Sequence, residues 1–366
     1  MTRIAFQDQE VLNMRQHHYG LSRGFSLVEL MVAVALGLIL LAGLFTLFLT
    51  NSRSYREIDN ATRQIENGRY AIQLLTDDIR MAGYYGEFDP TELATPASPP
   101  DICDTTQANL IAGMPLHVQG LDADANTPTC IADRKTGTDI LVVRRTAACI
   151  AGTAGCDALT ATVPFLQAST CNSMDELESG NPLNYFILQN GPDNAATFKL
   201  RKRDCSDAGS KTGTRAPLRR YRTHIYYVAN NDKASDGIPT LKRLELGANG
   251  YSTIPLVNGI ENLQIEYGLD LDAVGSPKVY TADPNSYAAC AGTACAKAWR
   301  NTIAVKLHVL ARNTEKTAGY TDVKQYSLGL AGNGEPNLAG PFNDPFKRHV
   351  YTTVVSMNNP AGRNDQ

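Results

Sequence analysis

The longest apolar segment of the chain runs from Leu30 to Thr50, and its 21 residues include no ionisable side chain. A helix rises about 1.5 Å per residue, so the segment matches the roughly 30 Å hydrocarbon core of a membrane. Arg23 precedes the segment, and the next arginine is Arg53. This placement of basic residues predicts a single membrane span with a cytoplasmic N-terminus and an exported remainder.

The helical pattern continues beyond Thr50. Two rows recur every seven positions, Ile58, Ile65, Ile72 and Ile79 in one and Ala61, Gly68, Leu75 and Ala82 in the other. Most charged side chains fall beside this stripe, namely Arg56, Glu57, Arg63, Glu66, Arg69, Asp77 and Asp78. The pattern predicts one helix from about Phe25 to Ala82, ended by Gly83. The stripe fits a coiled coil or a helix packed on a sheet, and its small residues favour the sheet.

Shorter runs with a period of two follow the helix and predict strands. These runs are Ile140–Arg144, Tyr185–Leu188, Phe198–Arg203, Arg220–Val228, Leu241–Leu246, Leu263–Tyr267, Thr302–Leu310 and Val350–Val355. Alternation with one polar face is typical of an antiparallel sheet that is covered on one side. The amphipathic half of the long helix is the natural cover. We therefore expect an α+β fold, in which a long N-terminal helix packs on an antiparallel head.

Composition supports an exported protein with a folded head. The chain has 366 residues, 43% of them hydrophobic, and its net charge of −3 argues against a nucleic-acid binder. All eight cysteines follow residue 100, as expected for an oxidised, disulfide-bonded domain. Many pairings are open, and the shortest loops favour Cys149–Cys156, Cys290–Cys295, Cys103–Cys130 and Cys171–Cys205. A zinc site is the alternative, but the cysteines lack the closely paired spacing that it needs.

The sequence offers little catalytic or ligand-binding chemistry. It contains no G-x-S-x-G, H-E-x-x-H or Walker A pattern, so we expect neither an enzyme nor a cofactor. Asp122, Asp124, Asn126 and Asp133 have calcium-loop spacing, but Thr127 stands where the sharp turn requires glycine. We interpret this run as a solvated turn. We likewise interpret the basic stretches 201–203 and 215–222 as solvated strand faces rather than a DNA site, and His224 and His308 as structural.

The junction before the apolar run carries a specific resemblance. Gly24-Phe25-Ser26-Leu27-Val28-Glu29 resembles the processing site of type IV prepilins. The resemblance implies that prepilin peptidase cleaves after Gly24 and that Phe25 becomes N-methylated. It also implies that Glu29 meets the N-terminus of a neighbouring subunit, which is the partner that a carboxylate in apolar surroundings needs. A signal peptide or a plain membrane anchor is the alternative, but neither explains both the length of the run and Glu29.

Later motifs narrow the resemblance to the PilW family of minor pilins. They are residues 64–71, 77–84, 137–144, 259–268 and 346–355. The family resemblance implies a structural subunit that helps to initiate type IV pilus assembly near the tip, with twitching motility, adhesion and DNA uptake as system-level functions. Implied partners are other minor pilins, the major pilin, the inner-membrane assembly platform, a large tip adhesin and, before assembly, the lipid bilayer.

These interpretations divide the chain into four parts. Residues 1–24 form the cleaved leader, 25–50 the transmembrane and filament-core helix, 51–83 the amphipathic helix, and 84–366 the exported head. The head is expected in the periplasm and then on the pilus. A minor pseudopilin of type II secretion shares the same N-terminal logic and stays open as an alternative. A membrane-anchored binding protein or enzyme is the alternative from another class.

Overall fold

The computed structural model describes residues 24–171, 185–191, 196–205 and 213–364. The chain divides into two compact units, residues 1–56 and residues 57–366. Most of the expected leader, residues 1–23, lies outside the described residues.

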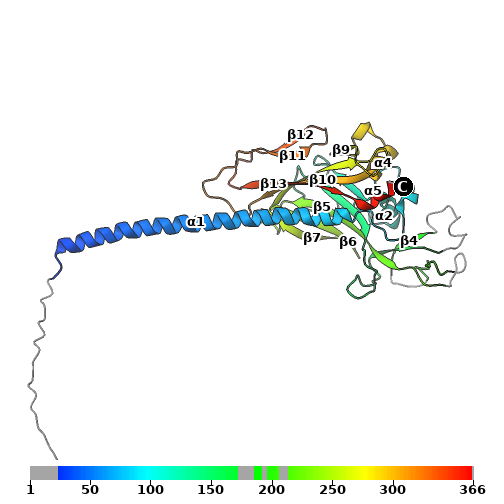
Figure 1. Ribbon diagram of the computed structural model, residues 1–366, viewed down its shortest axis with the longest axis horizontal. Helices are drawn as coiled ribbons and strands as arrows, with labels where there is room; N and C mark the ends of the chain where they lie inside the picture. Colours follow the sequence, from blue (N-terminus) through cyan, green and yellow to red (C-terminus); the bar gives the residue numbers. More distant parts are fainter. Residues whose placement is uncertain (1–23, 172–184, 192–195, 206–212, 365–366) are drawn as a thin grey trace, which may run out of the picture. The chain divides into compact units, whose positions relative to one another are not determined.

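The first long element is helix α1, Leu27–Arg80 (Figure 1). Its bounds lie within two residues of the predicted helix at each end. The sequence sustains a helix of this length because it contains no proline after Phe25 until Pro90. Gly83 adopts a φ of 72°, the left-handed conformation in which glycine commonly ends helices. The predicted helix and its stop signal are therefore confirmed.

The larger sheet of the second unit has seven antiparallel strands. Its main order is β1-β2-β5-β3-β4, and β6 pairs with both β5 and β7. The long strand β5 joins the parts, because it pairs with β2, β3 and β6. The bounds are β1 Val118–Leu121, β2 Ile140–Thr146, β3 Pro164–Ala168, β4 Phe186–Asn190, β5 Leu218–Ala229, β6 Thr240–Gly247 and β7 Gly250–Asn258.

A second sheet has four antiparallel strands in the order β13-β10-β8-β9, and a separate hairpin pairs β11 with β12. The bounds are β8 Ile260–Leu269, β9 Val279–Thr281, β10 Thr302–Arg312, β11 Tyr326–Leu330, β12 Pro336–Ala339 and β13 Arg348–Ser356. The short helices are η1 Pro90–Glu92, α2 Gln107–Gly113, η3 Tyr287–Ala289, α4 Thr293–Arg300 and α5 Asn358–Asn364. The structure is thus the expected α+β, pilin-like architecture.

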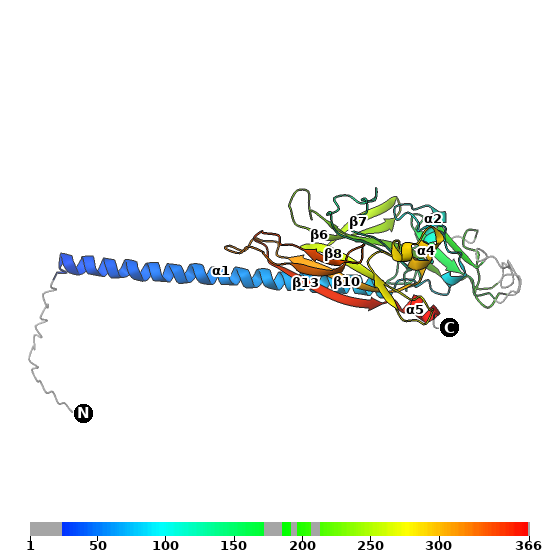
Figure 2. The same ribbon diagram turned by 90° about the horizontal axis from the view of Figure 1, so that it is seen from above.

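The main core lies between the second half of α1 and both sheets (Figure 2). Leu75 and Ile79 are fully buried, and each contributes about 1.5–3 kcal/mol by leaving water. The same cluster contains Ala71 and Ala82 of the helical region and side chains of β2, β5, β6, β8, β10 and β13. Helix α1 therefore covers a sheet, as the small residues of its stripe indicated, and does not need a coiled-coil partner to bury this face.

The buried face of α1 differs in part from the predicted stripe. Gly68, Leu75 and Ala82 are buried as expected, but Ile58 and Ile65 are 64% and 43% exposed. Gln64, Ala71 and Asp78 occupy the second buried row instead. The period was right, and Ile72 and Ile79 contact the core as expected. Gln64 and Asp78 join the buried face because groups of the head form hydrogen bonds with them.

The strand predictions were right for seven of the eight runs and wrong for Phe198–Arg203. That segment forms an isolated bridge between Arg201 and Arg215. Phe198 and Leu200 are buried, so the alternating pattern correctly indicated which side chains face the interior. The backbone of Leu200, however, bonds in part to the side chain of Gln167, which takes the place of a regular ladder partner. Six strands were not predicted, namely β1, β3, β7, β9, β11 and β12; all but β7 are five residues or shorter, and β3, β7 and β12 each contain a proline.

Four disulfides bridge the loops of the second unit. They join Cys103 to Cys130, Cys149 to Cys156, Cys171 to Cys205, and Cys290 to Cys295. These are the pairs that the shortest loop lengths favoured, and they leave no free cysteine among the residues that the structure describes.

Candidate functional site

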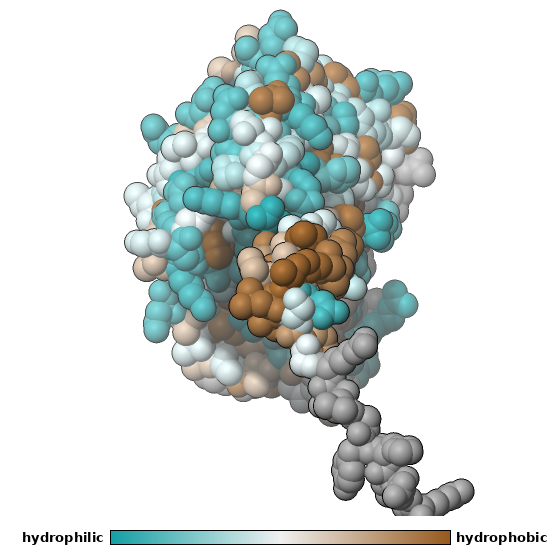
Figure 3. All heavy atoms as spheres, turned by 90° about the vertical axis from the view of Figure 1, so that its left-hand side faces the viewer, coloured by the Kyte–Doolittle hydropathy of each residue, from teal (hydrophilic) through white to brown (hydrophobic). Residues whose placement is uncertain are grey.

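The first half of α1 exposes a continuous apolar surface. Residues 27–50 are exposed apart from Gly37, and this stretch is long and apolar enough to cross a membrane. Figure 3 shows the helix side chains of this surface in brown. Leu40, Phe45 and Phe48, for example, are between 63% and 68% exposed. Such a surface requires lipid or other protein helices around it.

The residues of the expected processing site lie at the start of this helix. Gly24 and Phe25 are exposed and precede the first helical residue, Leu27. Glu29 is in the first turn, and one of its carboxylate oxygens accepts a hydrogen bond from the backbone N–H of Ser26 at 3.3 Å. Acidic side chains are favoured in this position because the first N–H groups of a helix lack backbone partners. The peptide bond after Gly24 is thus presented outside regular structure.

A buried ionic cluster fixes the end of α1 to the larger sheet. Asp78 is only 6% exposed and accepts hydrogen bonds from three side chains. Arg145 donates at 2.6 Å, His224 lies at 2.7 Å through Nδ1, and the hydroxyl of Tyr226 donates at 2.7 Å. The sequence pattern placed Asp78 on the polar face of the helix, which was wrong. The reason is that these three partners come from strands far along the chain and were invisible to helical periodicity.

The electrostatics of this cluster keep Asp78 charged. Burial raises the pKa of its carboxyl, but His224 and then Arg145 lower it by more. The net pKa lies well below its usual range, so the group is ionised at neutral pH. A buried charge that is paired and fully hydrogen-bonded orients the elements that hold it. Here the carboxylate ties α1 to β2 and β5.

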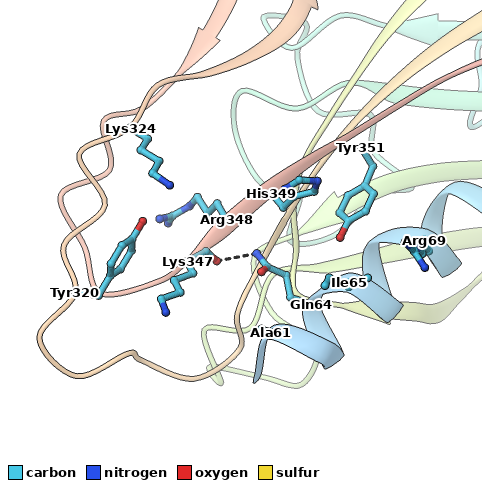
Figure 4. A pocket seen from close by; sticks show the side chains of 10 residues that line it. All are labelled: Ala61, Gln64, Ile65, Arg69, Tyr320, Lys324, Lys347, Arg348, His349 and Tyr351. Atoms are coloured by element: carbon cyan, nitrogen blue, oxygen red, sulfur yellow. Dashed lines mark hydrogen bonds between the residues drawn. The ribbon is translucent and has the colours of Figure 1, made fainter. Parts of the chain in front are cut away.

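A second polar contact joins α1 to the smaller sheet. The side-chain amide of Gln64 donates to the carbonyl oxygens of Ala311 at 2.8 Å and of Lys347 at 2.9 Å (Figure 4). Four residues later the helix has Gly68, and a Cβ at this position would collide with the ring of Tyr351. Glycine therefore permits the close approach of α1 to β13. Sequence reasoning treated Gly68 as a small stripe residue and missed the role of Gln64.

The motif at residues 346–355 contains a structural arginine. The side chain of Arg348 is fully buried and binds three carboxylates, those of Glu261, Asp322 and Asp344. Burial lowers the pKa of Arg348, and these carboxylates raise it by more, so the guanidinium stays charged. Its guanidinium carbon also lies 3.8 Å from the ring centre of Phe342. Arg348 thus secures the loop before β13 to β8.

The candidate calcium residues do not converge. Asp133 turns its carboxylate to the side chains of Asn230 and Asn231. The guanidinium of Arg134 donates to the carbonyl oxygens of Asp122 at 3.1 Å and of Ala125 at 2.7 Å, so a protein cation already binds this turn. Among the described residues, no group of three His, Cys, Asp or Glu side chains could hold a metal ion.

The other side chains that were singled out have structural partners. Arg220 and Arg222 both bind Asp157, at 3.0 and 2.9 Å. His308 lies 2.9 Å from a carboxylate oxygen of Glu266 and is buried, and His224 belongs to the Asp78 cluster. The basic run of β5 is therefore largely engaged within the head.

Two family models match the chain. Residues 225–359 match PilW, the type IV pilus-assembly protein W, and residues 21–45 match the prokaryotic N-terminal methylation motif. No curated protein and no solved structure gives a significant match. The first match spans β8, β10 and β13 and includes Arg348 with its three carboxylate partners. The second spans Gly24, Glu29 and most of the apolar surface.

These matches agree with the geometry. The methylation motif and the exposed apolar helix fit a membrane-anchored pilin that meets prepilin peptidase and other pilus components. The PilW family is structural, which fits a protein without catalytic activity. Together the matches support a prepilin-like protein of the PilW family, a minor pilin related to the type IV pilus.

Proposed function

We propose that this protein is a filament subunit that helps to initiate type IV pilus assembly and occupies a position near the pilus tip. The observation that carries the proposal is one helix that begins with a methylation signal, exposes an apolar surface over residues 27–50 and anchors a head by its second half. Residues 1–24 act as the leader, 25–50 as the membrane and filament-core helix, 51–83 as the head-packing helix and 84–366 as the exported head.

Prepilin peptidase cleaves after Gly24, and Phe25 becomes the methylated N-terminus. The exposure of both residues, and their position ahead of the helix, support this step because a peptidase needs an extended, accessible chain. The new ammonium lies four residues before Glu29.

Glu29 selects a neighbouring subunit during assembly. Among the described residues its carboxylate accepts one hydrogen bond, from the backbone N–H of Ser26 at 3.3 Å, although a carboxylate can accept several. In a bundle of apolar helices an unpaired carboxylate costs several kcal/mol, and the ammonium of another subunit removes that cost. The same pair would set the register between subunits.

The leader stays in the cytoplasm, the span lies in the inner membrane, and the head is periplasmic before it reaches the pilus. Arg23 ahead of the apolar run supports this orientation. The four disulfides support an oxidising compartment for the head. A head of about 280 residues is difficult to stack repeatedly, which supports a tip-proximal place beside other minor pilins, the assembly platform and a large adhesin. Twitching motility, adhesion and DNA uptake are the expected system-level functions.

Mass spectrometry of the mature N-terminus tests this function. N-methylated Phe25 is expected, and a chain that retains Met1 would contradict the proposal. Deletion of the gene should reduce surface piliation and leave type II secretion intact, whereas a secretion defect with normal pili would indicate a pseudopilin.

The role of Glu29 is tested by Glu29→Ala. We expect normal cleavage but at least about tenfold less protein in sheared pili, because the apolar helix loses its only paired charge. Glu66→Ala is the matched control, since Glu66 lies outside the apolar run, is exposed and does not line the groove that α1 shares with the head. Normal incorporation of Glu29→Ala would refute the charge pairing.

A further inference from the structure

A groove with basic and aromatic walls opens on the second unit. Helix α1 contributes Ile65 and Arg69, the loop before β11 contributes Tyr320 and Lys324, and β13 with its preceding residue contributes further walls (Figure 4). The cavity has a volume of about 370 Å³. We call it the basic groove. None of its ten lining residues, all of which the structure describes, carries a carboxylate.

The charges of the basic groove are incompletely balanced. Among the described residues, neither Arg69 nor Lys324 forms an ion pair. Lys347 pairs with Glu57 at 3.2 Å outside the lining, and its ammonium lies 5.7 Å from the ring centre of Tyr320. Arg348, by contrast, is neutralised by the three carboxylates behind it. Arg69 and Lys324 are therefore the cations available to an incoming anion.

The walls also offer contacts that a protein chain would use. The hydroxyl of Tyr351 is buried and has no hydrogen-bond partner among the described residues. Ile65 of α1 lines the same groove and is 43% exposed. Arginine and tyrosine next to an exposed apolar side chain are the residue types enriched in protein interfaces. An unpaired hydroxyl in such a wall can be satisfied by an incoming carbonyl or carboxylate.

The positions of the two unpaired cations distinguish between anionic occupants. Figure 4 places Lys324 and Arg69 toward opposite ends of the groove, on different elements. A single phosphate is bound best where several donors converge on one point, as at a helix N-terminus or in a bidentate arginine clamp. Cations at two ends, with aromatic and apolar walls between them, suit an extended chain that carries carboxylates at separated positions.

We propose that the basic groove receives an acidic segment of a neighbouring pilus subunit, whose carboxylates pair with Arg69 and Lys324. This inference rests on the proposed function, because it requires the chain to assemble beside other pilins. The groove would then set which subunit follows this one, since charge complementarity acts chiefly on partner choice and register. The exposed Ile65 would pack against the apolar side chains of the same segment.

Photo-crosslinking of the full-length protein in piliated cells tests the inference. A benzophenone amino acid replaces Tyr320, and the crosslinked peptide is identified by mass spectrometry. The expected product joins this groove to a peptide of another pilin that contains two or more Asp or Glu residues. Arg69→Glu combined with Lys324→Glu should reduce the adduct by about tenfold or more, because like charges would then face each other.

The control changes the net charge equally at another place. Lys199→Glu with Lys202→Glu alters two exposed cations away from the groove and should leave the adduct unchanged. If the groove variant unfolds, Arg69→Gln with Lys324→Gln removes the charges without reversing them, and should also lower the yield. Lysine at the identified acidic positions of the partner should restore the adduct of the Glu variant.

An adduct with lipid, an adduct with a second copy of this chain, or an adduct yield that the groove variants do not change would each overturn the inference. The absence of an adduct, in cells whose pili contain this protein with a mature Phe25 terminus, would also overturn it and leave the proposed function intact. A chain that keeps Met1 and is missing from pili would instead refute the proposed function.

Discussion

Asp78→Asn is the most informative perturbation of the head. The substitution keeps the size of the side chain but removes the charge that Arg145 and His224 face at 2.6 and 2.7 Å. The asparagine also places an amide N–H₂ donor where Asp78 had an acceptor oxygen. Arg145 and Tyr226 donate hydrogen bonds to Asp78, and the ring nitrogen of His224 that faces it can also be a donor. At least one donor must then lose its acceptor inside the protein.

The structure indicates a large effect. Removal of one partner from a buried ion pair typically costs about 3–5 kcal/mol. Arg145 is 17% exposed and can recover some hydration, so we expect the lower end, about 3 kcal/mol. For a domain of more than 200 residues each kcal/mol shifts the unfolding midpoint by about 2 °C, which gives a loss of about 6 °C.

The assay is thermal unfolding of the full-length protein in detergent micelles, followed by circular dichroism. Asp77→Asn is the matched control, because Asp77 is the neighbouring residue but is exposed. Its midpoint should stay within about 1 °C of wild type, since surface substitutions change stability by about 0.5 kcal/mol or less. Equal midpoints for the two variants would refute the assignment of Asp78 as the ionic anchor of α1.

The pH dependence supplies a second readout. The folded-state pKa of Asp78 lies below its unfolded value of about 3.9, so its stabilisation is fully present above that pH. It is lost as the pH falls through the folded-state value. The difference between wild type and Asp78→Asn should therefore be constant near neutral pH and shrink below about pH 4. A difference that grows on acidification would contradict this reasoning.

Three further predictions concern packing, loops and burial. Gly68→Ala should lower the unfolding midpoint although alanine favours a helix by about 1 kcal/mol, since its Cβ would strike the ring of Tyr351. In a Tyr351→Ala background, which has its own packing cost, the same substitution should no longer lower the midpoint. Replacing both Cys103 and Cys130 by serine should lower the free energy of unfolding in urea by about 3–4 kcal/mol, and replacing both Cys290 and Cys295 by about 2 kcal/mol. The difference is expected because the two disulfides close loops of 27 and 5 residues; equal losses would argue against an effect of loop closure on the unfolded chain. Burial, then Arg363 and Arg300, lowers the pKa of His117 to about 3, so stability should fall as the pH drops below about 6.5, and His117→Gln should flatten this dependence in the same assay.

Much of the fold was accessible because it is encoded locally. The bounds of α1 follow from an unbroken helical pattern and a glycine stop, and seven strands follow from alternation. The row that α1 buries was predicted only in part. Ile65 is more hydrophobic than Gln64, but Gln64 is the buried residue because two backbone carbonyls of the head accept its amide. Hydrophobicity alone could not report this exchange.

The sequence by itself determined the parts of this protein that depend on composition and short-range spacing: a membrane-length helix, a processing signal and a β-rich head with cysteines. Those features are readable because helical and strand periods repeat within a few residues. The tertiary structure alone decided how Asp78 is neutralised, why Gly68 is needed and which cations remain unpaired in the basic groove. These properties arise from side chains up to hundreds of residues apart in sequence, and only the folded chain brings their charges within contact distance.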